Sequence, residues 1–572
     1  MVGSFQVRGT NAAALFTLRV HRGEGMALLA MNWKRGEPPD DFVGFAIEYR
    51  EPGGEKFFPV RNRLSFPAVD GDDDADVRSS LRSPIQKFRW VHFPFRADMP
   101  GAFTYRVTPV FMDDHDVLRA GEAQTIDIEL RRETYPGKLN VTFTRGFVSS
   151  QAFVDRFEKN GEISTLLPDE AEDGLRFQPT HPDTEEALSW MGFEARGAVL
   201  EVLDQAIAHA DAKVSVVAYD LSEPDVVGRL EQLGDRLRII IDDSGEEHGG
   251  KHSGETQAAA RLEASAGKDN VKRQHMGALQ HNKTIVVSGT RLHKAICGST
   301  NYSWRGFFVQ NNNAVILSGK AATKPFLAAF EQYWETNSPS VFGTSPAAQW
   351  ADLGLRGIDA KVAFSPHSSA NALLNEVASD MEANTTSSLL YSLAFLAQTK
   401  GSVREAVTKL TERDDIFVFG MADKKVGGID LQTPDGNRAP VNPARLGENA
   451  PEPFKSEPSG GSGIRLHHKF VVIDFDQPTG RVYLGSYNFS RPADRDNGEN
   501  LLLIRDQRIA VAYMIEALRL FDHYQFRVKQ STAKKAGGSL GLRRPPRAAG
   551  EVPWWKKDYT EPTRIRDRLL FG

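Results

Sequence analysis

The segments HNKTIVVS (281–288) and HHKFVVID (467–474) decide the fold, because they are two copies of one pattern placed 186 residues apart. A second pair of segments, GSTNYS (298–303) and GSYNFS (485–490), repeats at an interval of 187 residues. A weaker match, FQP at Phe177 and FSP at Phe364, has the same interval of 187 residues. Self-similarity over a long and nearly constant interval is typical of a duplicated structural unit. The sequence therefore predicts two related halves.

The residues around these motifs alternate between strand and helix patterns. KVSVVAYDL (213–221) and LRIIIDDS (237–244) are typical of buried strands, and DVVGRLEQLG (225–234) between them is typical of a helix. This alternation predicts a largely parallel sheet covered by helices. Each half is expected to end in an amphipathic helix, at PFLAAFEQYWE (325–335) and at MIEALRLFDHYQFR (514–527).

The region before the halves has a different pattern. Apolar residues alternate with other residues in two segments, as Val43, Phe45, Ile47 and Tyr49 and as Phe103, Tyr105 and Val107. Period-two alternation between turn signals predicts an all-β sandwich of the immunoglobulin-like type. The layout resembles a fibronectin type III domain. That resemblance implies a module that braces the chain or binds a protein partner, and we expect no catalysis there.

Composition limits the class of protein. A length of 572 residues predicts about three to four domains. A net charge of −5 excludes a wholly basic nucleic-acid binder but leaves room for a local basic groove. The single cysteine, Cys297, excludes an intrachain disulfide. The first 20 residues lack the pattern of a signal peptide, and no apolar run of about 18 residues occurs, so we expect a cytoplasmic protein without a transmembrane segment.

The repeated motif carries the chemistry. His467 and Lys469 are two residues apart on a predicted strand, so both side chains point to one face, and His281 and Lys283 repeat this arrangement. If the halves pack about a pseudo-twofold axis, two imidazoles and two ammonium groups converge. The lysines can bind phosphate oxygens, while one histidine attacks phosphorus and the other protonates the leaving oxygen. The pattern predicts a phosphodiesterase with a covalent phosphohistidine intermediate that needs neither metal nor cofactor.

The order HxKxxxxD followed by GSxNxS, present twice, resembles the signature of the phospholipase D superfamily over residues 140 to 530. The resemblance implies two pseudo-twofold-related α/β halves. It also implies phosphate-binding and supporting residues, namely Ser299, Asn301, Ser486 and Asn488 for phosphate and Asn312, Asp474 and Glu499 for support. The first copy departs from the family pattern in having Ser288 where the second has Asp474, and Asn312 where the second has Glu499. In the family that aspartate is mainly structural, so Ser288 is compatible with activity.

The asymmetry between the copies suggests a division of labour. By resemblance, Glu499 is expected to contact His467 and to keep it protonated as the general acid. Asn312 is then expected to orient His281, which stays neutral as a nucleophile must. The family more often places the nucleophile in the first half, which agrees with this assignment.

Two polar segments interrupt the halves. Residues 244–256 (SGEEHGGKHSGET) and 424–463 have the composition of loops, and each precedes a histidine–lysine motif. The sequence predicts that both are loops that overhang the site or are disordered. His248 and His252 are interpreted as solvated loop residues rather than metal ligands.

The C-terminal tail is basic, with ten Lys or Arg residues and four acidic residues in 531–572. Trp554, Trp555 and Tyr559 could stack on nucleic-acid bases or meet an anionic membrane. We favour a third interpretation, in which the tryptophans pack on the catalytic body and the run 534–547 is flexible. The predicted domains are 1–135, 140–345, 350–530 and the tail 531–572.

Three functions remain compatible with the sequence. A nuclease acting on DNA or RNA is favoured by the basic tail and the expected location. A phospholipase D or transphosphatidylase acting on phospholipids is the alternative, and an inactive phosphate-binding relative is the third. A nuclease predicts a long basic groove across the site, whereas a lipase predicts a pocket rimmed by exposed apolar side chains.

Overall fold

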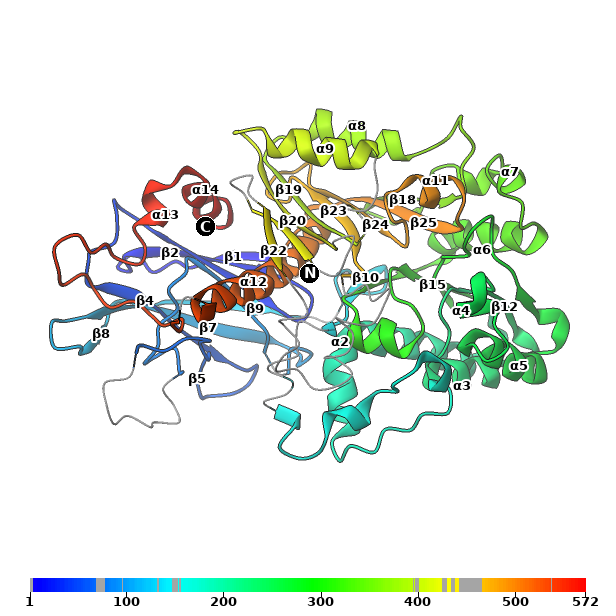
Figure 1. The fold of residues 1–572 in the computed structure, drawn as a ribbon, viewed down its shortest axis with the longest axis horizontal. Coiled ribbons are helices and arrows are strands. Elements are labelled where there is room, and N and C mark those ends of the chain that lie inside the picture. The colour runs from blue at the N-terminus through cyan, green and yellow to red at the C-terminus, as the bar shows by residue number, and fades with distance from the viewer. Residues whose placement is uncertain are drawn as a thin grey trace. The chain divides into compact units, whose positions relative to one another are not determined.

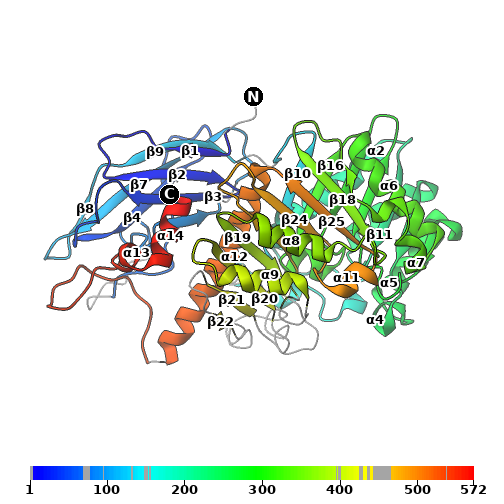
Figure 2. The ribbon, with the colours of Figure 1, turned by 90° about the horizontal axis from the view of Figure 1, so that it is seen from above.

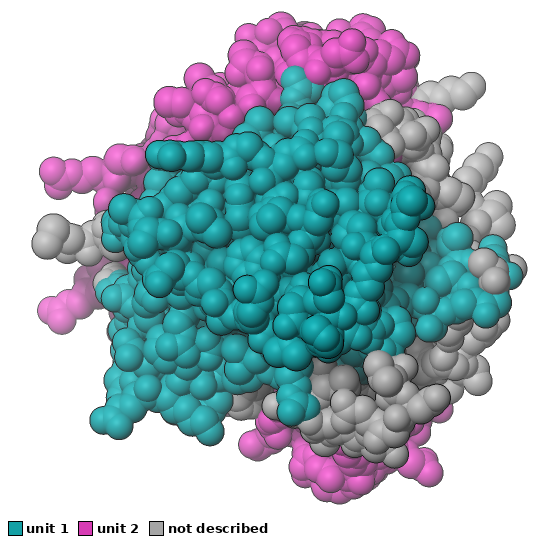
Figure 3. All heavy atoms as spheres, turned by 90° about the vertical axis from the view of Figure 1, so that its left-hand side faces the viewer, with its two compact units in different colours: residues 1–132, 511–572 teal, residues 133–510 magenta. Residues whose placement is uncertain are grey.

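The computed structural model describes residues 4–67, 78–94, 96–130, 133–146, 153, 156–394, 396, 401–423, 429–433, 438–441, 466–535 and 537–572. The chain forms two compact units, shown in two colours in Figure 3. One comprises Met1–Arg132 together with Val511–Gly572, and the other comprises Glu133–Ala510. The residues from Val511 onward thus group with the N-terminal region, which differs from the predicted domain ranges.

The first half of the unit Glu133–Ala510 holds a seven-stranded sheet in the order β10-β16-β15-β14-β11-β12-β13 (Figure 1). Its strands are β10 (Leu139–Phe143), β11 (Lys213–Ala218), β12 (Leu237–Ile241), β13 (Val271–Arg273), β14 (Thr284–Ser288), β15 (His293–Gly298) and β16 (Asn313–Ser318). Its helices are α2 (Thr184–Ala208), α3 (Pro224–Leu233), α4 (Gly245–Gly249), α5 (Gly254–Ala266), α6 (Lys320–Glu335) and α7 (Pro339–Phe342). Shorter turns of helix are η2 (Ile163–Leu166), η3 (Ala171–Asp173), η4 (Gly234–Arg236), η5 (Lys268–Asn270), η6 (Arg305–Val309) and η7 (Pro346–Ala348).

The second half holds a nine-stranded sheet in the order β17-β18-β25-β24-β23-β19-β20-β21-β22. Its strands are β17 (Ala351–Asp352), β18 (Asp359–Ser365), β19 (Ser388–Leu393), β20 (Phe417–Asp423), β21 (Ile429–Gln432), β22 (Arg438–Val441), β23 (Lys469–Ile473), β24 (Arg481–Gly485) and β25 (Glu499–Arg505). Its helices are α8 (Leu374–Asn384), α9 (Ser402–Thr411), α11 (Arg491–Arg495) and the start of α12 (Gln507–Lys535). Helices α8 and α9 cover one face of this sheet (Figures 1 and 2), where Val377, Met381, Val407 and Leu410 join one hydrophobic core.

The duplication is visible in the strand order. Six strands, β10-β16-β15-β14-β11-β12, match β18-β25-β24-β23-β19-β20 in both order and direction. Two related α/β halves are therefore confirmed. The weaker match of Phe177 with Phe364 is not part of the repeat. Phe364 pairs with Asn500 on β25, and the residue paired with Asn313 on the equivalent strand is Phe143.

The prediction of a largely parallel sheet is wrong. In the described residues, parallel pairs are confined to β11 with β12, β12 with β13, and β19 with β20. The other pairs in both sheets are antiparallel, since β14 and β15 are joined by only four residues and so short a connection cannot return the chain to a parallel start. The alternation of strand and helix in 213–244 holds only for the first part of each half.

Helix α6 joins the two halves of the unit. The Phe326 ring packs edge-on against Phe364 of β18 at a centroid distance of 5.2 Å, and the Tyr333 hydroxyl donates to the Ser365 carbonyl oxygen at 2.5 Å. The expected helix at the end of the first half is thus present and contacts the second half. This packing keeps the two sheets close enough to share one site.

The segment 244–256 is not a loop. It forms α4 and the start of α5, where the Ser253 side chain caps the helix by accepting from the Thr256 backbone N–H at 3.1 Å. A serine two residues before a glutamate at the head of an alanine-rich run is an N-cap signal. Within 424–463, the structure gives strands β21 and β22, and the remaining residues lie outside the described part.

The unit that contains the N-terminus has two antiparallel sheets, as predicted for a β-sandwich. One has the order β1-β2-β3-β6 and the other β5-β4-β7-β8, with β9 also paired to β7. The strands are β1 (Gln6–Arg8), β2 (Phe16–Arg22), β3 (Ala27–Trp33), β4 (Phe42–Arg50), β5 (Phe58–Pro59), β6 (Arg89–His92), β7 (Ala102–Met112), β8 (Leu118–Ala120) and β9 (Gln124–Glu129). The fibronectin type III resemblance stays a prediction.

One detail of the predicted alternation is different. Phe45, Ile47 and Tyr49 face the main core of the sandwich, but Val43 belongs to a separate cluster with Ala46. A register irregularity between Phe42 and Gly44 explains this, because one extra residue moves the side chains before it to the other face.

Trp554 and Trp555 of the tail pack on this sandwich, which differs from the predicted packing on the catalytic body. Trp555 is 2% exposed within the sandwich core, and the Trp554 indole N–H donates to the Phe42 carbonyl oxygen at 2.9 Å. Arg543 and Arg547 hydrogen-bond Gln86 and Asp116 of the sandwich, so this part of the basic run is held in place. The chain ends in α13 (Lys557–Thr560) and α14 (Pro562–Phe571). Within the described ranges, none of the helices has the length and apolarity needed to cross a membrane.

Candidate active site

The two histidine–lysine motifs meet in the unit Glu133–Ala510. His281 and Lys283 immediately precede β14, while His467 precedes β23 and Lys469 begins it. All four side chains are at least 96% buried, and the imidazole centroids of His281 and His467 are 6.3 Å apart. The structure thus brings together the four residues on which the sequence interpretation depends.

Each histidine is oriented by a residue of the opposite half. Nδ1 of His281 is 2.7 Å from a Glu499 carboxylate oxygen, and Nδ1 of His467 is 2.7 Å from the Asn312 amide oxygen. The predicted pairing of Glu499 with His467 and Asn312 with His281 is therefore wrong. Glu499, the first residue of β25, and Asn312, directly before β16, each contact the histidine of the opposite half. When Nδ1 carries the proton in these bonds, Nε2 of each ring has a lone pair for chemistry.

A second pair of crossing contacts lies beside the first. The Asn500 amide donates to the Asn282 side-chain oxygen at 2.6 Å, and Asn313 Nδ2 is 3.4 Å from His468 Nδ1. Asn282 and His468 are the residues between the histidine and the lysine of each motif. The sequence interpretation did not single out these residues. Asn282 and His468 lie directly beside the histidine and lysine of each motif, and Asn313 and Asn500 directly follow Asn312 and Glu499. These positions, the same in both copies, could have identified the four residues from the sequence.

The serines of the GSxN segments support the crossing residues. Ser299 Oγ donates to the Asn312 amide oxygen at 2.9 Å and accepts from the Asn313 backbone N–H at 3.1 Å. Ser486 Oγ accepts from the Asn500 backbone N–H at 2.9 Å. These serines therefore hold Asn312, Asn313 and Asn500 in place, and direct binding of phosphate by Ser299 and Ser486 stays a prediction.

The two asparagines of the GSxN segments differ in their surroundings. The Asn301 amide nitrogen donates to Asp220 at 2.6 Å, whereas Asn488 is only partly buried. In both, the side-chain oxygen has no hydrogen-bond partner in the described structure. Phosphate binding by either residue remains a prediction.

Burial and positive charge set the protonation of the site. Burial, followed by the nearby Lys283 and Lys469 ammonium groups, lowers the pKa of His281 and of His467 well below the usual value. His467 is therefore neutral in the free site, contrary to the prediction that it rests protonated. Burial also raises the pKa of Glu499 to about 8. Because burial disfavours a charge on either group alone, His281 and Glu499 share one proton. Arg305, which the sequence interpretation missed, also lowers the His467 pKa.

A pH dependence follows from Lys283. Burial lowers the pKa of its ammonium group to about 8, so the positive charge is present below this pH and is lost above it. We expect kcat/KM for an anionic phosphodiester to fall as the pH rises through about 8. A pH–rate profile checks this, and Lys283→Arg should move the falling limb upward because a guanidinium stays protonated. An unchanged limb in that variant would assign it to another group.

Asp474 lies at the far end of β23 from His467. Its buried carboxylate accepts hydrogen bonds from Thr386, Ser387 and Ser388, which lead into β19. The residue thus joins two strands of the second sheet and does not face the imidazoles. In the first half, Ser288 ends β14 opposite His293.

The glycines that begin the GSxN segments permit a close approach of strands. Gly485 has φ of 146° and Gly298 has φ of 125°, and a Cβ at Gly485 would collide with the Asn500 carbonyl oxygen. We expect Gly485→Ala to lower the free energy of unfolding by about 2–4 kcal/mol, because it adds both strain and a backbone clash. Chemical denaturation measures the loss. Gly228→Ala in helix α3 is the matched control, since its Cβ would meet open space and no loss is expected.

A set of buried polar residues adjoins the first motif and was not predicted as part of the site. Tyr219 packs against His281 at a centroid distance of 4.6 Å and against His248 at 4.3 Å. His248 is 8% exposed, so its interpretation as a solvated loop residue is wrong, whereas His252 is exposed. Among the described residues, Asp220, His248 and Glu255 form the one group of three close enough to share a metal ion.

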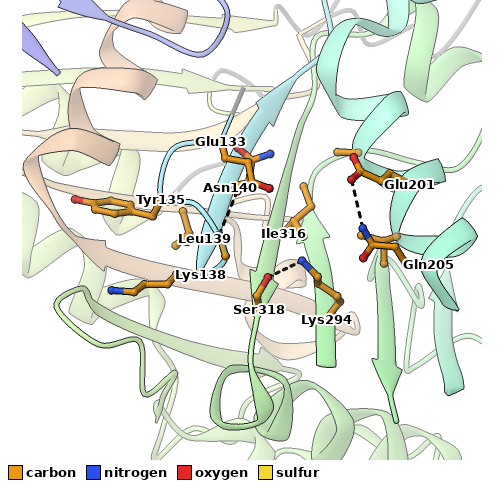
Figure 4. A pocket seen from close by; sticks show the side chains of 13 residues that line it. Glu133, Tyr135, Lys138, Leu139, Asn140, Glu201, Gln205, Lys294, Ile316 and Ser318 are labelled. Atoms are coloured by element: carbon orange, nitrogen blue, oxygen red, sulfur yellow. Dashed lines mark hydrogen bonds between the residues drawn. The ribbon is translucent and has the colours of Figure 1, made fainter. Parts of the chain in front are cut away.

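A separate pocket lies between α2 and the edge of the first sheet (Figure 4). Its lining includes Glu133, Lys138, Glu201 and Lys294, and it contains none of the predicted site residues. No histidine is among the described residues that line this pocket, whereas the histidine–lysine site pairs two imidazoles with two ammonium groups, so that site is the better candidate for the chemistry.

The protein thus belongs to the class of duplicated α/β proteins in which two His/Lys pairs meet at one site. Each half supplies the residue that orients the histidine of the other half. Comparison with known proteins adds the family. The family model described as "Cardiolipin synthase, PLD-like domain" matches residues 203–334, which include the first motif. This match and the short matches to curated relatives support the resemblance to the phospholipase D superfamily that the repeated motifs indicate.

The individual relatives are distant or short matches. A "Phospholipase D" of Rickettsia typhi (strain ATCC VR-144 / Wilmington) is 42% identical over 48 residues, which are 8% of this chain and 22% of the relative. The chain thus matches about a fifth of that relative's length. Among solved structures, Nuc from Salmonella typhimurium is 22% identical, with a TM-score of 0.20, over 25% of this chain and 87% of that one. Phosphatidylserine synthase from Haemophilus influenzae Rd KW20 is 13% identical, with a TM-score of 0.38, over 66% and 93%.

Proposed function

We propose that this protein is a phosphodiesterase that works through a covalent phosphohistidine, with His281 as the nucleophile and His467 as the general acid. The observation that carries the proposal is the pair of buried imidazoles, each fixed at Nδ1 by the opposite half and flanked by a buried lysine. A phosphate between the rings is then within reach of both Nε2 atoms and of Lys283 and Lys469.

The carboxylate decides the roles. When His281 Nε2 attacks phosphorus, the ring acquires a positive charge, and Glu499 at 2.7 Å from Nδ1 stabilises it. Asn312 offers His467 an acceptor without charge, so a protonated His467 gives up its proton more readily. The roles agree with those expected from the sequence, but the reason is reversed because the carboxylate supports the nucleophile and not the acid.

The two steps balance as follows. His467, neutral in the free site, takes up a proton at Nε2 as the anionic phosphodiester binds. His281 Nε2 then forms a bond to phosphorus as the bond from phosphorus to the leaving oxygen breaks, and His467 supplies the proton that this oxygen takes up. Water then attacks phosphorus, His467 receives its proton, and the P–N bond breaks to regenerate His281. The lysines stabilise the charge on the non-bridging oxygens in both steps.

For the substrate we propose DNA or RNA. Of the large apolar side chains that are exposed in the described residues, only Val341 lies in the catalytic unit, which does not fit a site rimmed for lipid. Lys283, Lys469 and Arg305 gather positive charge at the reacting centre, as a polyanionic substrate requires.

The test is an activity assay of the full chain in EDTA with labelled single-stranded DNA, double-stranded DNA, RNA and phosphatidylcholine vesicles. We expect cleavage of a nucleic acid that is lost in His467→Ala and retained in His252→Gln, a substitution at an exposed histidine. Choline release from the vesicles would replace the nuclease assignment with a lipase. Binding of nucleic acid without turnover would replace it with a phosphate clamp.

A further inference from the structure

A second polar cluster, next to the first histidine–lysine motif, lies at the ends of two neighbouring strands. Asp220 follows β11 and Asp242 follows β12, and these strands are parallel, so both carboxylates emerge at one edge of the sheet. Helices α4 and α5 add His248 and Glu255 over this edge. Asp242, His248 and Glu255 are buried, and Asp220 is partly buried.

The position of His248 is fixed from one side. Its Nδ1 is 2.7 Å from an Asp242 carboxylate oxygen, and the other oxygen of Asp242 accepts from the Gln280 backbone N–H at 2.6 Å. A carboxylate on Nδ1 selects the tautomer in which Nε2 has the lone pair. This is the outer contact that orients metal-binding histidines in proteins.

The second ring nitrogen of His248, Nε2, lies beside another carboxylate. Nε2 is 3.2 Å from Asp220 Oδ1, and ligand atoms of Asp220, His248 and Glu255 all lie within 4.8 Å of one another. Neighbouring ligands of a tetrahedral zinc ion, with bonds of about 2.0–2.1 Å, are about 3.3 Å apart. His248 and Asp220 have this spacing, and a ligand atom of Glu255 lies within 4.8 Å of theirs.

The carboxylates are oriented as ligands would be. Asp220 accepts from the Asn301 amide through Oδ2, which leaves Oδ1 toward His248. Glu255 accepts from the Leu221 backbone N–H through Oε1 at 3.0 Å. Each therefore has one oxygen held by the protein, and the other can bind an ion.

The charge of the cluster also favours a cation. Three carboxylates surround one imidazole, so the cluster attracts a cation.

We propose that Asp220, His248 and Glu255 form a binding site for a divalent transition-metal ion such as Zn²⁺, with Asp242 as the outer partner of the histidine. One imidazole, two carboxylates and a water molecule are a donor set that suits zinc. The ion would bind at Nε2 and leave the hydrogen bond that Asn301 donates to Asp220 intact. Its role would be to hold Asp220, and through it the first GSxN segment, so catalysis by the histidine pairs does not pass through it.

The experiment titrates Zn²⁺ into the EDTA-treated and dialysed full chain in competition with a chromophoric chelator. We expect one saturable site per chain, an affinity at least 100-fold lower in His248→Gln, and a loss of about 10–100-fold in Asp242→Asn. His252→Gln is the matched control in the same segment and should bind as the parent does. His281→Gln/His467→Gln should also keep the site, which separates it from zinc capture by the catalytic imidazoles.

Two results would overturn the proposal. One is the absence of a saturable site in the parent protein, and the other is an affinity that falls only in the His281/His467 double variant. If His248→Gln does not fold, as judged by thermal denaturation, Glu255→Gln takes its place. The Co²⁺-loaded parent provides an independent readout, because a low-coordinate site gives strong visible absorption and its absence would count equally against the site.

Discussion

Alanine at His281 is expected to abolish formation of the covalent intermediate, whereas alanine at His467 is expected to preserve it when the leaving group is good. Removing either histidine should slow cleavage of an ordinary phosphodiester by about 10³-fold or more, because each acts in a separate bond change. The two variants should lose different steps of the reaction. A nitrophenolate leaving group needs no proton, so it bypasses the general acid but not the nucleophile.

The measurement uses a nucleotide p-nitrophenyl ester and rapid mixing. We expect His467→Ala to release one equivalent of nitrophenol per chain in a burst and then to turn over slowly, since no base remains to activate water. Radiolabelled protein should carry an acid-labile adduct that peptide mapping places at His281. We expect neither burst nor adduct from His281→Ala.

The opposite pattern would reverse the roles. A burst from His281→Ala with an adduct at His467 would show that Asn312, and not Glu499, supports the nucleophile. Steady turnover in both variants without an adduct would contradict the covalent mechanism altogether. His252→Gln serves as the control for unspecific effects of removing a histidine.

Asp474→Ala is expected to have the largest effect on stability among the predicted site residues. The carboxylate accepts from the backbone N–H groups of Thr386, Ser387 and Ser388 and from the Thr386 hydroxyl. Alanine leaves these donors without their acceptor and also places an L-residue without a polar side chain at φ of 51°. The free energy of unfolding should fall by about 3–5 kcal/mol.

Urea denaturation of the parent and two variants measures this effect. Asp474→Asn should lose less than Asp474→Ala, because the amide keeps one acceptor and asparagine tolerates the left-handed region. The fraction that remains folded should cleave substrate at nearly the parental kcat. A large drop in kcat without a loss of stability would instead place Asp474 in the chemistry.

The sequence was most informative where residues repeat. The two His/Lys motifs and the two GSxN segments predicted the halves, their pseudo-symmetry and the four buried residues at the centre. Their spacing could not tell which half supplies Glu499 to which histidine, because two antiparallel hairpins can approach an axis from either side. The choice is seen only in the folded contacts, where Glu499 meets His281 and Asn312 meets His467.

Other differences have local causes. His248 was interpreted as solvated because glycines and charged residues surround it, yet α4 and α5 bury it under Asp220 and Asp242. Those aspartates directly follow the runs KVSVVAY and LRIII, and carboxylates at the ends of neighbouring parallel strands were a usable signal. The tryptophans of the tail gave no such signal, since their partner Phe42 lies more than 500 residues earlier.

The exchange of Glu499 and Asn312 between halves means that neither half holds a finished set of reactive groups. A half expressed alone would contain its histidine and lysine but would lack the acceptor that fixes the ring. Turnover therefore reports whether the halves have docked, and in a denaturant titration it should vanish as soon as they separate, even while each sheet keeps its secondary structure. Mixing two inactive chains, one damaged at His281 and one at Glu499, should not restore activity unless whole halves change places between molecules.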